Sequence, residues 1–374
     1  MGEAACHAAV MLRGQGDYRC DGLSAMFRLM SSPPVVATGR ALRLVGHSLT
    51  YALVLGIVSG CDRGGEGRQG AVRAAAPLEL FTAGALAQPL RAAADSFAAV
   101  TGTAAARLEA AGSLETVRKL TELRRIPDVV AVADAELIAG LLMPDLATWY
   151  VVVASDRMVL AYTDRSRGAD SINLTNWPEV ITGEGVEVGR SDPDRDPAGY
   201  RALLAMKLAE RQLARPGLAE RLLEHAPVRL MRPKSADLVA LLQTGEVDYT
   251  WSYASTARAA GLKMLELPDV VSLGDAALAT TYAAESVAVA GRARGDTLVI
   301  HGRPILFALT VPTGAPHPDR AVEFVAWLLG VDGQRVLRAA GLDLLPQALV
   351  VGELAPAMIR RAAGPGATDP VSTR

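Results

Sequence analysis

Leu78–Gly84 reads LELFTAG, Thr103–Ser113 reads TAAARLEAAGS and Pro127–Val132 reads PDVVAV, with amphipathic runs between them. The pattern predicts a short strand in each stretch, a helix over about 85–100 and a second helix led by Ser113. The third stretch is apolar almost throughout, as in a strand that is buried on both faces. Alternating strands and helices form a parallel sheet with helices on both faces, and such sheets bind ligands at the carboxyl ends of their strands.

Composition limits the number of domains and the classes of function. The 374 residues are 50% hydrophobic with a net charge of -2, so the chain has material for about two folded domains and lacks the basic surface that nucleic acids require. The three cysteines, Cys6, Cys20 and Cys61, all lie near the start. The rest of the chain therefore has no thiol nucleophile, disulfide or Cys/His metal site, and we expect no cofactor.

The first part of the chain resembles an export signal. Residues 40–61 combine arginines, an apolar run and the sequence Val58-Ser59-Gly60-Cys61, which resembles the lipobox of bacterial lipoproteins. We expect residues 1–39 to be a non-structural extension, Cys61 to carry a lipid, and residues 62–76 to be a flexible tether to the extracytoplasmic face of the membrane. The alternative is a short core helix that ends in a free cysteine.

Four strand-to-helix turns could bind an anion. They lie at 84–85, at Ser113, at Asp196 with Pro197 in the first helical position, and at Ser235. We expect Ser113, Asp196 and Ser235 to be N-caps. Backbone N–H groups at a helix start lack intrahelical partners, so several starts aimed at one cleft could hold an oxyanion. For any single turn, ordinary capping is the alternative.

A resemblance extends over roughly residues 77–350. The stretches that carry it are Phe81-Thr82-Ala83-Gly84-Ala85-Leu86, Glu109-Ala110-Ala111-Gly112-Ser113, Met143-Pro144, Trp149-Tyr150, Val159-Leu160-Ala161-Tyr162-Thr163, Thr175-Asn176-Trp177, Asp196-Pro197-Ala198-Gly199-Tyr200-Arg201 and Val311-Pro312-Thr313. Together they resemble the molybdate/tungstate-binding proteins of ABC importers, and most closely the tungstate-binding branch. The resemblance implies an α/β, type II periplasmic-binding-protein fold, in which two lobes joined by crossover strands close on the ligand like a hinge. We expect lobe 1 at 77–162 and 269–350, lobe 2 at 163–268, and a partly disordered C-terminal segment at 351–374.

The resemblance also implies ligand-binding residues. Ser113 matches a serine that donates to the oxyanion, Tyr253 matches a tyrosine further along, and Asp196 matches an aspartate that reaches the metal in the tungstate branch. Ala198 stands where that branch usually has cysteine. The candidate binding residues are Gly84, Ala85, Ser113, Asp196, Ala198, Ser235 and Tyr253.

Two positions depart from the pattern of that family. Ala85 replaces a serine, which removes a hydrogen bond worth about 1.5–3 kcal/mol unless Thr82 or Lys234 compensates. Ser235 replaces a glutamate, which favours a four-coordinate oxyanion held by hydrogen bonds. A carboxylate beside a dianion repels it, so Asp196 either coordinates the metal, caps its own helix, or is protonated.

The sequence therefore predicts a monomeric, lipid-anchored protein that captures molybdate or tungstate and delivers it to the permease of an ABC importer. It is not expected to be an enzyme or to bind nucleic acid. Two alternatives remain: a sensor or partner-binding protein of the same fold that binds a sulfate- or phosphate-like anion or none, and an enzyme that uses the cluster Asp192, Asp194 and Asp196.

Overall fold

The computed structural model describes residues 76–290 and 296–365. The predicted extension and signal peptide, the predicted lipidation site Cys61 and all but the last residue of the predicted tether lie outside this part of the chain. Among the described residues, no helix has the length and apolar character needed to cross a membrane.

The first sheet has six strands and forms lobe 1. Their order is β13-β4-β12-β3-β1-β2, where β1–β2 and β1–β3 are parallel pairs while β12 and β13 run antiparallel to their neighbours. The sheet is therefore mixed rather than wholly parallel. Its strands are β1 (Glu79–Ala83), β2 (Arg107–Ala111), β3 (Val129–Val132), β4 (Tyr150–Asp156), β12 (Ile305–Thr310) and β13 (Asp343–Val351).

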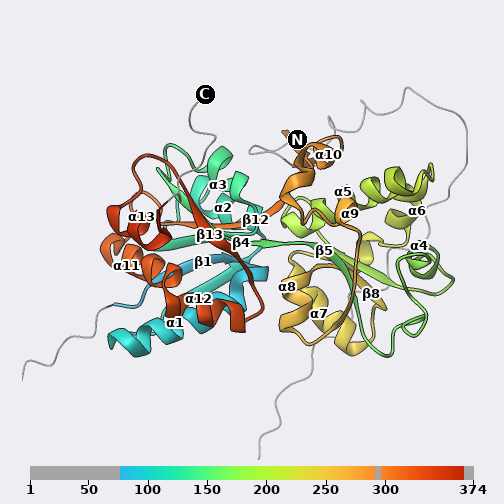
Figure 1. Cartoon of the computed structure of the whole chain (residues 1–374), viewed down its shortest axis with the longest axis horizontal. Helices are drawn as coiled ribbons and strands as arrows, with labels where there is room; N and C mark the ends of the chain where they lie inside the picture. Colours follow the sequence, from blue (N-terminus) through green and yellow to red (C-terminus); the bar gives the residue numbers. More distant parts are fainter. Residues whose placement is uncertain (1–75, 291–295, 366–374) are drawn as a thin grey trace, which may run out of the picture. The chain divides into compact units, whose positions relative to one another are not determined.

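Helices cover this sheet on two sides. Figure 1 shows α2 and α3 on one side and α1 and α12 on the other. The lobe 1 helices are η1 (Gly84–Leu86), α1 (Ala87–Thr101), α2 (Ser113–Thr121), α3 (Ala135–Leu141), α11 (Pro318–Leu329), α12 (Val331–Ala339) and α13 (Ala357–Ala363). Helix α13 lies within the C-terminal segment that was predicted to be partly disordered.

The second sheet has five strands in the order β7-β6-β8-β5-β9 and forms lobe 2. Its strands are β5 (Met158–Tyr162), β6 (Val188–Ser191), β7 (Met231–Arg232), β8 (Tyr249–Tyr253) and β9 (Lys263–Glu266). The helices between β5 and β12 are α4 (Trp177–Ile181), α5 (Pro197–Leu213), α6 (Leu218–Glu224), η2 (Val228–Leu230), α7 (Ser235–Thr244), α8 (Ala254–Ala259), α9 (Asp269–Ser272), η3 (Ala276–Leu278) and α10 (Ala279–Tyr282).

The change from one sheet to the other comes earlier than predicted. Strand β5, which the sequence analysis places in lobe 1, pairs with β8 and β9 of lobe 2. Only Arg157 separates it from β4. Both strands are largely apolar and buried, and the short polar stretch Ser155-Asp156-Arg157 between their apolar parts is the break that the predicted boundary did not use. The chain returns to lobe 1 at β12, after the separate hairpin of β10 (Ser286–Ala290) and β11 (Thr297–His301).

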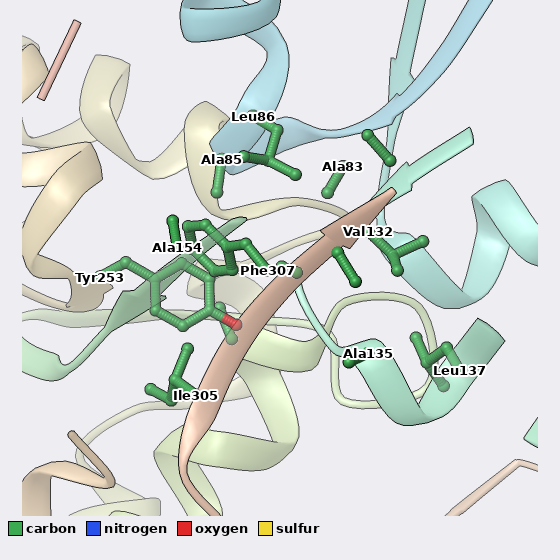
Figure 2. Close-up of a cluster of buried hydrophobic side chains, with 14 of the residues drawn as sticks. Ala83, Ala85, Leu86, Val132, Ala135, Leu137, Ala154, Tyr253, Ile305 and Phe307 are labelled. Atoms are coloured by element: carbon green, nitrogen blue, oxygen red, sulfur yellow. The ribbon is translucent and has the colours of Figure 1, made fainter. Parts of the chain in front are cut away.

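The apolar core continues across the boundary between the two sheets. In β3, Val129, Val130 and Val132 are fully buried, as their unbroken apolar run predicts. Figure 2 shows Tyr253, from the end of lobe 2 strand β8, among side chains of lobe 1. Its ring packs edge-on against Phe307 of β12, with the ring centroids 5.5 Å apart. Tyr253 is therefore held from both lobes.

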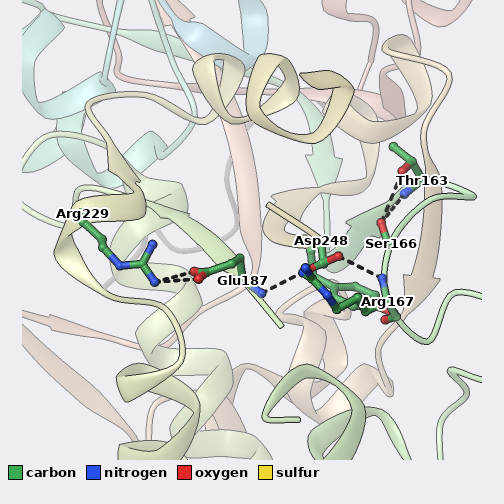
Figure 3. A network of polar contacts seen from close by, with 7 residues as sticks. Thr163, Ser166, Arg167, Glu187, Arg229 and Asp248 are labelled. Atoms are coloured by element: carbon green, nitrogen blue, oxygen red, sulfur yellow. Dashed lines mark hydrogen bonds and ion pairs between the residues drawn. The ribbon is translucent and has the colours of Figure 1, made fainter. Parts of the chain in front are cut away.

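A polar network in lobe 2 stabilises the loop that follows β5 (Figure 3). The buried carboxylate of Asp248 accepts hydrogen bonds from the backbone N–H groups of Arg167 and Glu187, each at 2.9 Å. The guanidinium of Arg167 adds an ion pair with the same carboxylate at 2.6 Å. Arg229 in turn donates to both oxygens of Glu187. None of these groups belongs to the predicted site.

Candidate functional site

The turn at the start of η1 lies against the turn at the start of α7. A Cβ atom on Gly84 would lie 3.3 Å from the Cβ atom of Lys234 and 3.5 Å from that of Ala236. Ala85 is buried beside them. A pocket with a volume of about 210 Å³ opens at this contact, lined by both turns and by Thr256 of α8. The first and fourth predicted turns, one from each lobe, therefore meet.

Ser113 is placed differently from the prediction. It is the first residue of α2, and the N-cap is Gly112, so the predicted capping role of Ser113 is wrong. The Ser113 hydroxyl is fully buried and its oxygen accepts a hydrogen bond from the backbone N–H of Ala133 at 2.9 Å. The hydroxyl faces the loop after β3 because the N–H group of Ala133, at the end of that strand, lies within hydrogen-bond distance.

The start of α2 also contacts lobe 2 directly. The backbone N–H groups of Leu114 and Glu115 point at the carbonyl oxygen of Arg195, at 3.1 and 3.4 Å. A Cβ atom on Gly112 would lie 2.1 Å from the same oxygen, so only glycine permits this approach. The second and third predicted turns are thus in contact across the two lobes.

Asp196 is the N-cap of α5, as predicted, and it also reaches the start of α7. Its two carboxylate oxygens accept from the backbone N–H of Ala198 at 3.3 Å and of Ser235 at 2.6 Å. Burial raises the pKa of this carboxyl, while these two amides and the neighbouring hydroxyls of Ser191 and Ser235 act in the opposite direction. The capping role is confirmed, and the carboxylate joins two helix starts.

Two serine hydroxyls beside Asp196 have unused hydrogen-bonding capacity. Ser235 is the first residue of α7 and Lys234 is the N-cap, so the predicted capping by Ser235 is wrong. Within the described residues, the buried hydroxyl oxygens of Ser191 and Ser235 form no well-aligned hydrogen bond. Buried polar groups are nearly always satisfied, and the carboxylate of Asp196, whose pKa both hydroxyls lower, is the polar group beside them.

A buried arginine joins the lobes next to Tyr253. Arg201 of α5 donates through Nη1 to the carbonyl oxygen of Ala133 at 2.5 Å and to the hydroxyl of Tyr253 at 2.8 Å. Its Nη2 lies 3.2 Å from a carboxylate oxygen of Asp134. The hydroxyl of Tyr200 donates to the same oxygen at 2.5 Å. The arrangement is a buried ion pair between α5 of lobe 2 and the loop after β3 of lobe 1.

The protonation states in this cluster follow from burial and charge. Burial opposes the charge of Arg201, but the Tyr253 oxygen and the Asp134 carboxylate raise its pKa overall. Burial raises the pKa values of Tyr200 and Tyr253, so both hydroxyls keep their protons.

All seven predicted residues lie at contacts between neighbouring turns. Gly84 and Ala85 lie against the turn that begins at Ser235. Asp196 links Ala198 to Ser235. A chain of hydrogen bonds through Ala133 and Arg201 links Ser113 to Tyr253. The predicted site lacks four residues that the structure places in it, Asp134, Ser191, Tyr200 and Arg201. Tyr200 and Arg201 lie in a motif it quoted, but no local pattern marks a charged side chain in the first turns of a helix as buried.

The side chains suggested as substitutes for the missing Ala85 hydroxyl have other partners. The hydroxyl of Thr82 donates to the carbonyl oxygen of Ala83 at 2.8 Å. The ammonium group of Lys234 lies 3.5 Å from the carboxylate of Asp237. Neither interaction belongs to the cluster around Asp196.

The acidic cluster that motivated an enzyme hypothesis is bound to the backbone. Asp192 accepts from the N–H of Asp194 at 3.0 Å, and Asp194 accepts from the N–H of Ala290 at 2.7 Å. In the described part of the chain, no group of three His, Cys, Asp or Glu side chains is arranged to hold a metal ion. The three carboxylates thus organise the turn before α5.

Known proteins are similar to this chain in sequence. A family model described as bacterial extracellular solute-binding protein matches residues 78–343. A solute-binding protein from Petrotoga mobilis is 37% identical over 57% of this chain and 66% of its own length. The molybdate/tungstate-binding protein WtpA from Pyrococcus abyssi is 32% identical over 83% of this chain and 96% of its own length.

A solved structure agrees in fold. The periplasmic molybdate-binding protein of Azotobacter vinelandii matches 72% of this chain and 100% of its own, with a TM-score of 0.54 and 17% sequence identity. At that identity the likeness concerns the fold alone, and it confirms the predicted α/β, type II periplasmic-binding-protein fold. The family model and the similarity to relatives over most of the sequence together show that this chain belongs to the bacterial extracellular solute-binding proteins.

Proposed function

We propose that the protein captures a tetrahedral oxyanion, molybdate or tungstate, between its two lobes and delivers it to the permease of an ABC importer. The observation that carries this proposal is the pair of buried Ser191 and Ser235 hydroxyls without well-aligned partners, set beside helix starts from both lobes. The similarity to a relative named for molybdate and tungstate supports this ligand class.

The proposed ligand contacts are hydrogen bonds rather than chemical steps. Oxyanion oxygens only accept, and the hydroxyls of Ser113, Ser191, Ser235 and Tyr253 each carry a proton that can be donated. The proposed site is made of the residues predicted from the sequence, of which Gly84, Ala85, Ser113, Ala198, Ser235 and Tyr253 line it and Asp196 positions it. No catalysis is proposed.

Asp196 has a separate role in this proposal. Both of its oxygens accept from backbone amides, which is the arrangement of a clamp between the starts of α5 and α7. We infer that it positions these two starts. Hydrogen bonds alone would then hold a four-coordinate oxyanion, and Asp196 would not bind the metal atom.

The proposed location follows from the first part of the sequence. We propose that residues 40–61 direct export, that Cys61 carries a lipid, and that the protein is a monomer on the extracytoplasmic face of the membrane. Metabolic labelling with a palmitate analogue tests the anchor. We expect label in the wild-type protein and none in C61A.

Isothermal titration calorimetry with the purified protein tests the ligand. We expect one molybdate or tungstate ion per chain to bind, with sulfate and phosphate much weaker and perchlorate as the negative control. Stronger binding of sulfate or phosphate would change the ligand assignment. No binding of any oxyanion would contradict the transport role and favour the sensor alternative, which the substitutions at Ala85 and Ser235 motivate.

A further inference from the structure

One continuous set of hydrogen bonds connects a predicted ligand residue of lobe 1 to one of lobe 2. The N–H of Ala133 donates to the Ser113 hydroxyl, and the carbonyl of Ala133 accepts from Arg201, which also donates to the Tyr253 hydroxyl. Ser113, Arg201 and Tyr253 are at most 1% exposed. The backbone of Ala133 thus contacts the Ser113 hydroxyl directly and the Tyr253 hydroxyl through Arg201.

The direction of these bonds determines what each hydroxyl can do next. A backbone N–H and a guanidinium can only donate, so the oxygens of Ser113 and Tyr253 are acceptors in these two bonds. A hydroxyl also has one proton to donate. In the described part of the chain, no hydrogen bond donated by either hydroxyl is found. Both protons are therefore available to a ligand that accepts.

Arg201 controls the hydroxyl on the lobe 2 side. Its guanidinium blocks the orientation in which Tyr253 would donate toward α5, because Nη1 occupies that side of the phenol oxygen at 2.8 Å. Asp134 holds Nη2 at 3.2 Å, so the guanidinium is fixed from lobe 1. Tyr253 thus becomes an oriented donor only when the loop after β3 contacts α5.

We propose that Arg201 is a positioning residue that makes the Tyr253 hydroxyl a donor to a bound, fully deprotonated oxyanion and makes this donor depend on contact between the lobes. This inference rests on the proposed function. It adds a residue outside the predicted ligand set, and it gives the ion pair with Asp134 a part in binding.

A double-mutant cycle measured by calorimetry with molybdate tests this role. In the wild-type background, we expect Y253F to weaken binding at least fivefold. In the R201M background, we expect the same Y253F change to weaken binding less than twofold, because the hydroxyl is no longer oriented. In R201K, which keeps a cationic donor, we expect the full effect of Y253F to return.

A matched control separates orientation from general loss of a buried cation. Arg190 is also buried and donates to the carbonyl of Ala226 at 2.9 Å, but it is not connected to Tyr253. In R190M, the Y253F change should retain its full fivefold effect. Equal effects of Y253F in the R201M and wild-type backgrounds would overturn the proposal. Absence of oxyanion binding in the wild-type protein would instead refute the proposed function.

If R201M does not fold, infrared difference spectra of ring-labelled tyrosine decide. Addition of molybdate to the wild-type protein should shift one phenol C–O band that is absent in Y253F, because the hydroxyl begins to donate. The corresponding band should be displaced in R201K, where an ammonium group replaces the guanidinium. Binding of molybdate without a tyrosine band shift would overturn the proposal.

Discussion

The two lobes differ in how far the buried polar groups between them have hydrogen-bond partners. In lobe 1, Ser113 and Asp134 both have well-formed partners. In lobe 2, the hydroxyls of Ser191 and Ser235 make no well-aligned hydrogen bond within the described residues. The oxygen of the lobe 1 serine is thus held by a backbone amide, whereas the oxygens of the two lobe 2 serines are not held in this way. A ligand bound between them would complete the bonding of lobe 2.

The largest expected effect comes from removing the lobe 1 charge that balances Arg201. D134A should lower the free energy of unfolding by about 3–5 kcal/mol, because it leaves a buried guanidinium without its counter-charge. Urea denaturation measures this change. D237A, which removes a half-exposed ion pair with Lys234, should stay within about 0.5 kcal/mol of the wild type. A D134A protein as stable as the wild type would contradict the buried ion pair.

The next largest effect is a pH dependence of stability from Asp156, where the chain passes from lobe 1 to lobe 2. Asp156, at the end of β4, is buried, and this burial raises its pKa from 3.8 to about 6 despite hydrogen bonds from Ser255 and from the Arg157 amide. The folded state therefore holds a proton that the unfolded state has lost between about pH 4 and pH 6. The unfolding free energy of the wild type, relative to D156N, should fall by on the order of 2–3 kcal/mol as pH rises through this window.

Urea denaturation of both proteins at several pH values measures this slope. Above about pH 6 the difference should stay constant, because Asp156 is then ionised in both states. A difference that does not change between pH 4 and pH 6 would rule out the raised pKa. E109Q is the opposite control, since hydrogen bonds from Arg125 and Lys119 lower the pKa of Glu109 to about 2.

Replacing the engaged serine of lobe 1 should have a smaller effect on stability and a clear effect on binding. S113A leaves the buried N–H of Ala133 without an acceptor, so the free energy of unfolding should fall by about 1–3 kcal/mol. Molybdate affinity should fall at least tenfold. Thermal unfolding and calorimetry on the same sample measure the two effects, and an unchanged stability would show that the bond to Ala133 contributes nothing.

The smallest effect on stability is expected for the equivalent serine of lobe 2. Ser235 occupies the same first helical position as Ser113, but its hydroxyl has no well-aligned partner. S235A should therefore change the free energy of unfolding by less than about 0.5 kcal/mol while it weakens molybdate binding several-fold. If S235A and S113A destabilise the protein equally, the contrast between the lobes is wrong.

Much of the fold could be predicted because its signals are local. The apolar run of β3 and the Asp196 cap with Pro197 after it each act through neighbouring residues. The lobe boundary was misplaced at β5, because strand pattern does not say which sheet a strand joins. The N-caps at Ser113 and Ser235 were each placed one residue late, because both hydroxyls face other parts of the fold.

By itself, the sequence determined the alternation of strands and helices, the positions of the four strand-to-helix turns, and the resemblance to oxyanion-binding proteins. Those features depend on side-chain periodicity, on turn chemistry and on short motifs. Tertiary structure alone decided that Arg201 is buried and that it pairs with Asp134, which lies 67 positions earlier in the chain. It also decided that the backbone of Ala133, together with Arg201, connects Ser113 to Tyr253. The reason is physical: burial and long-range pairing are properties of packed elements, and a charged residue in a helix has the same local pattern whether it faces water or another lobe.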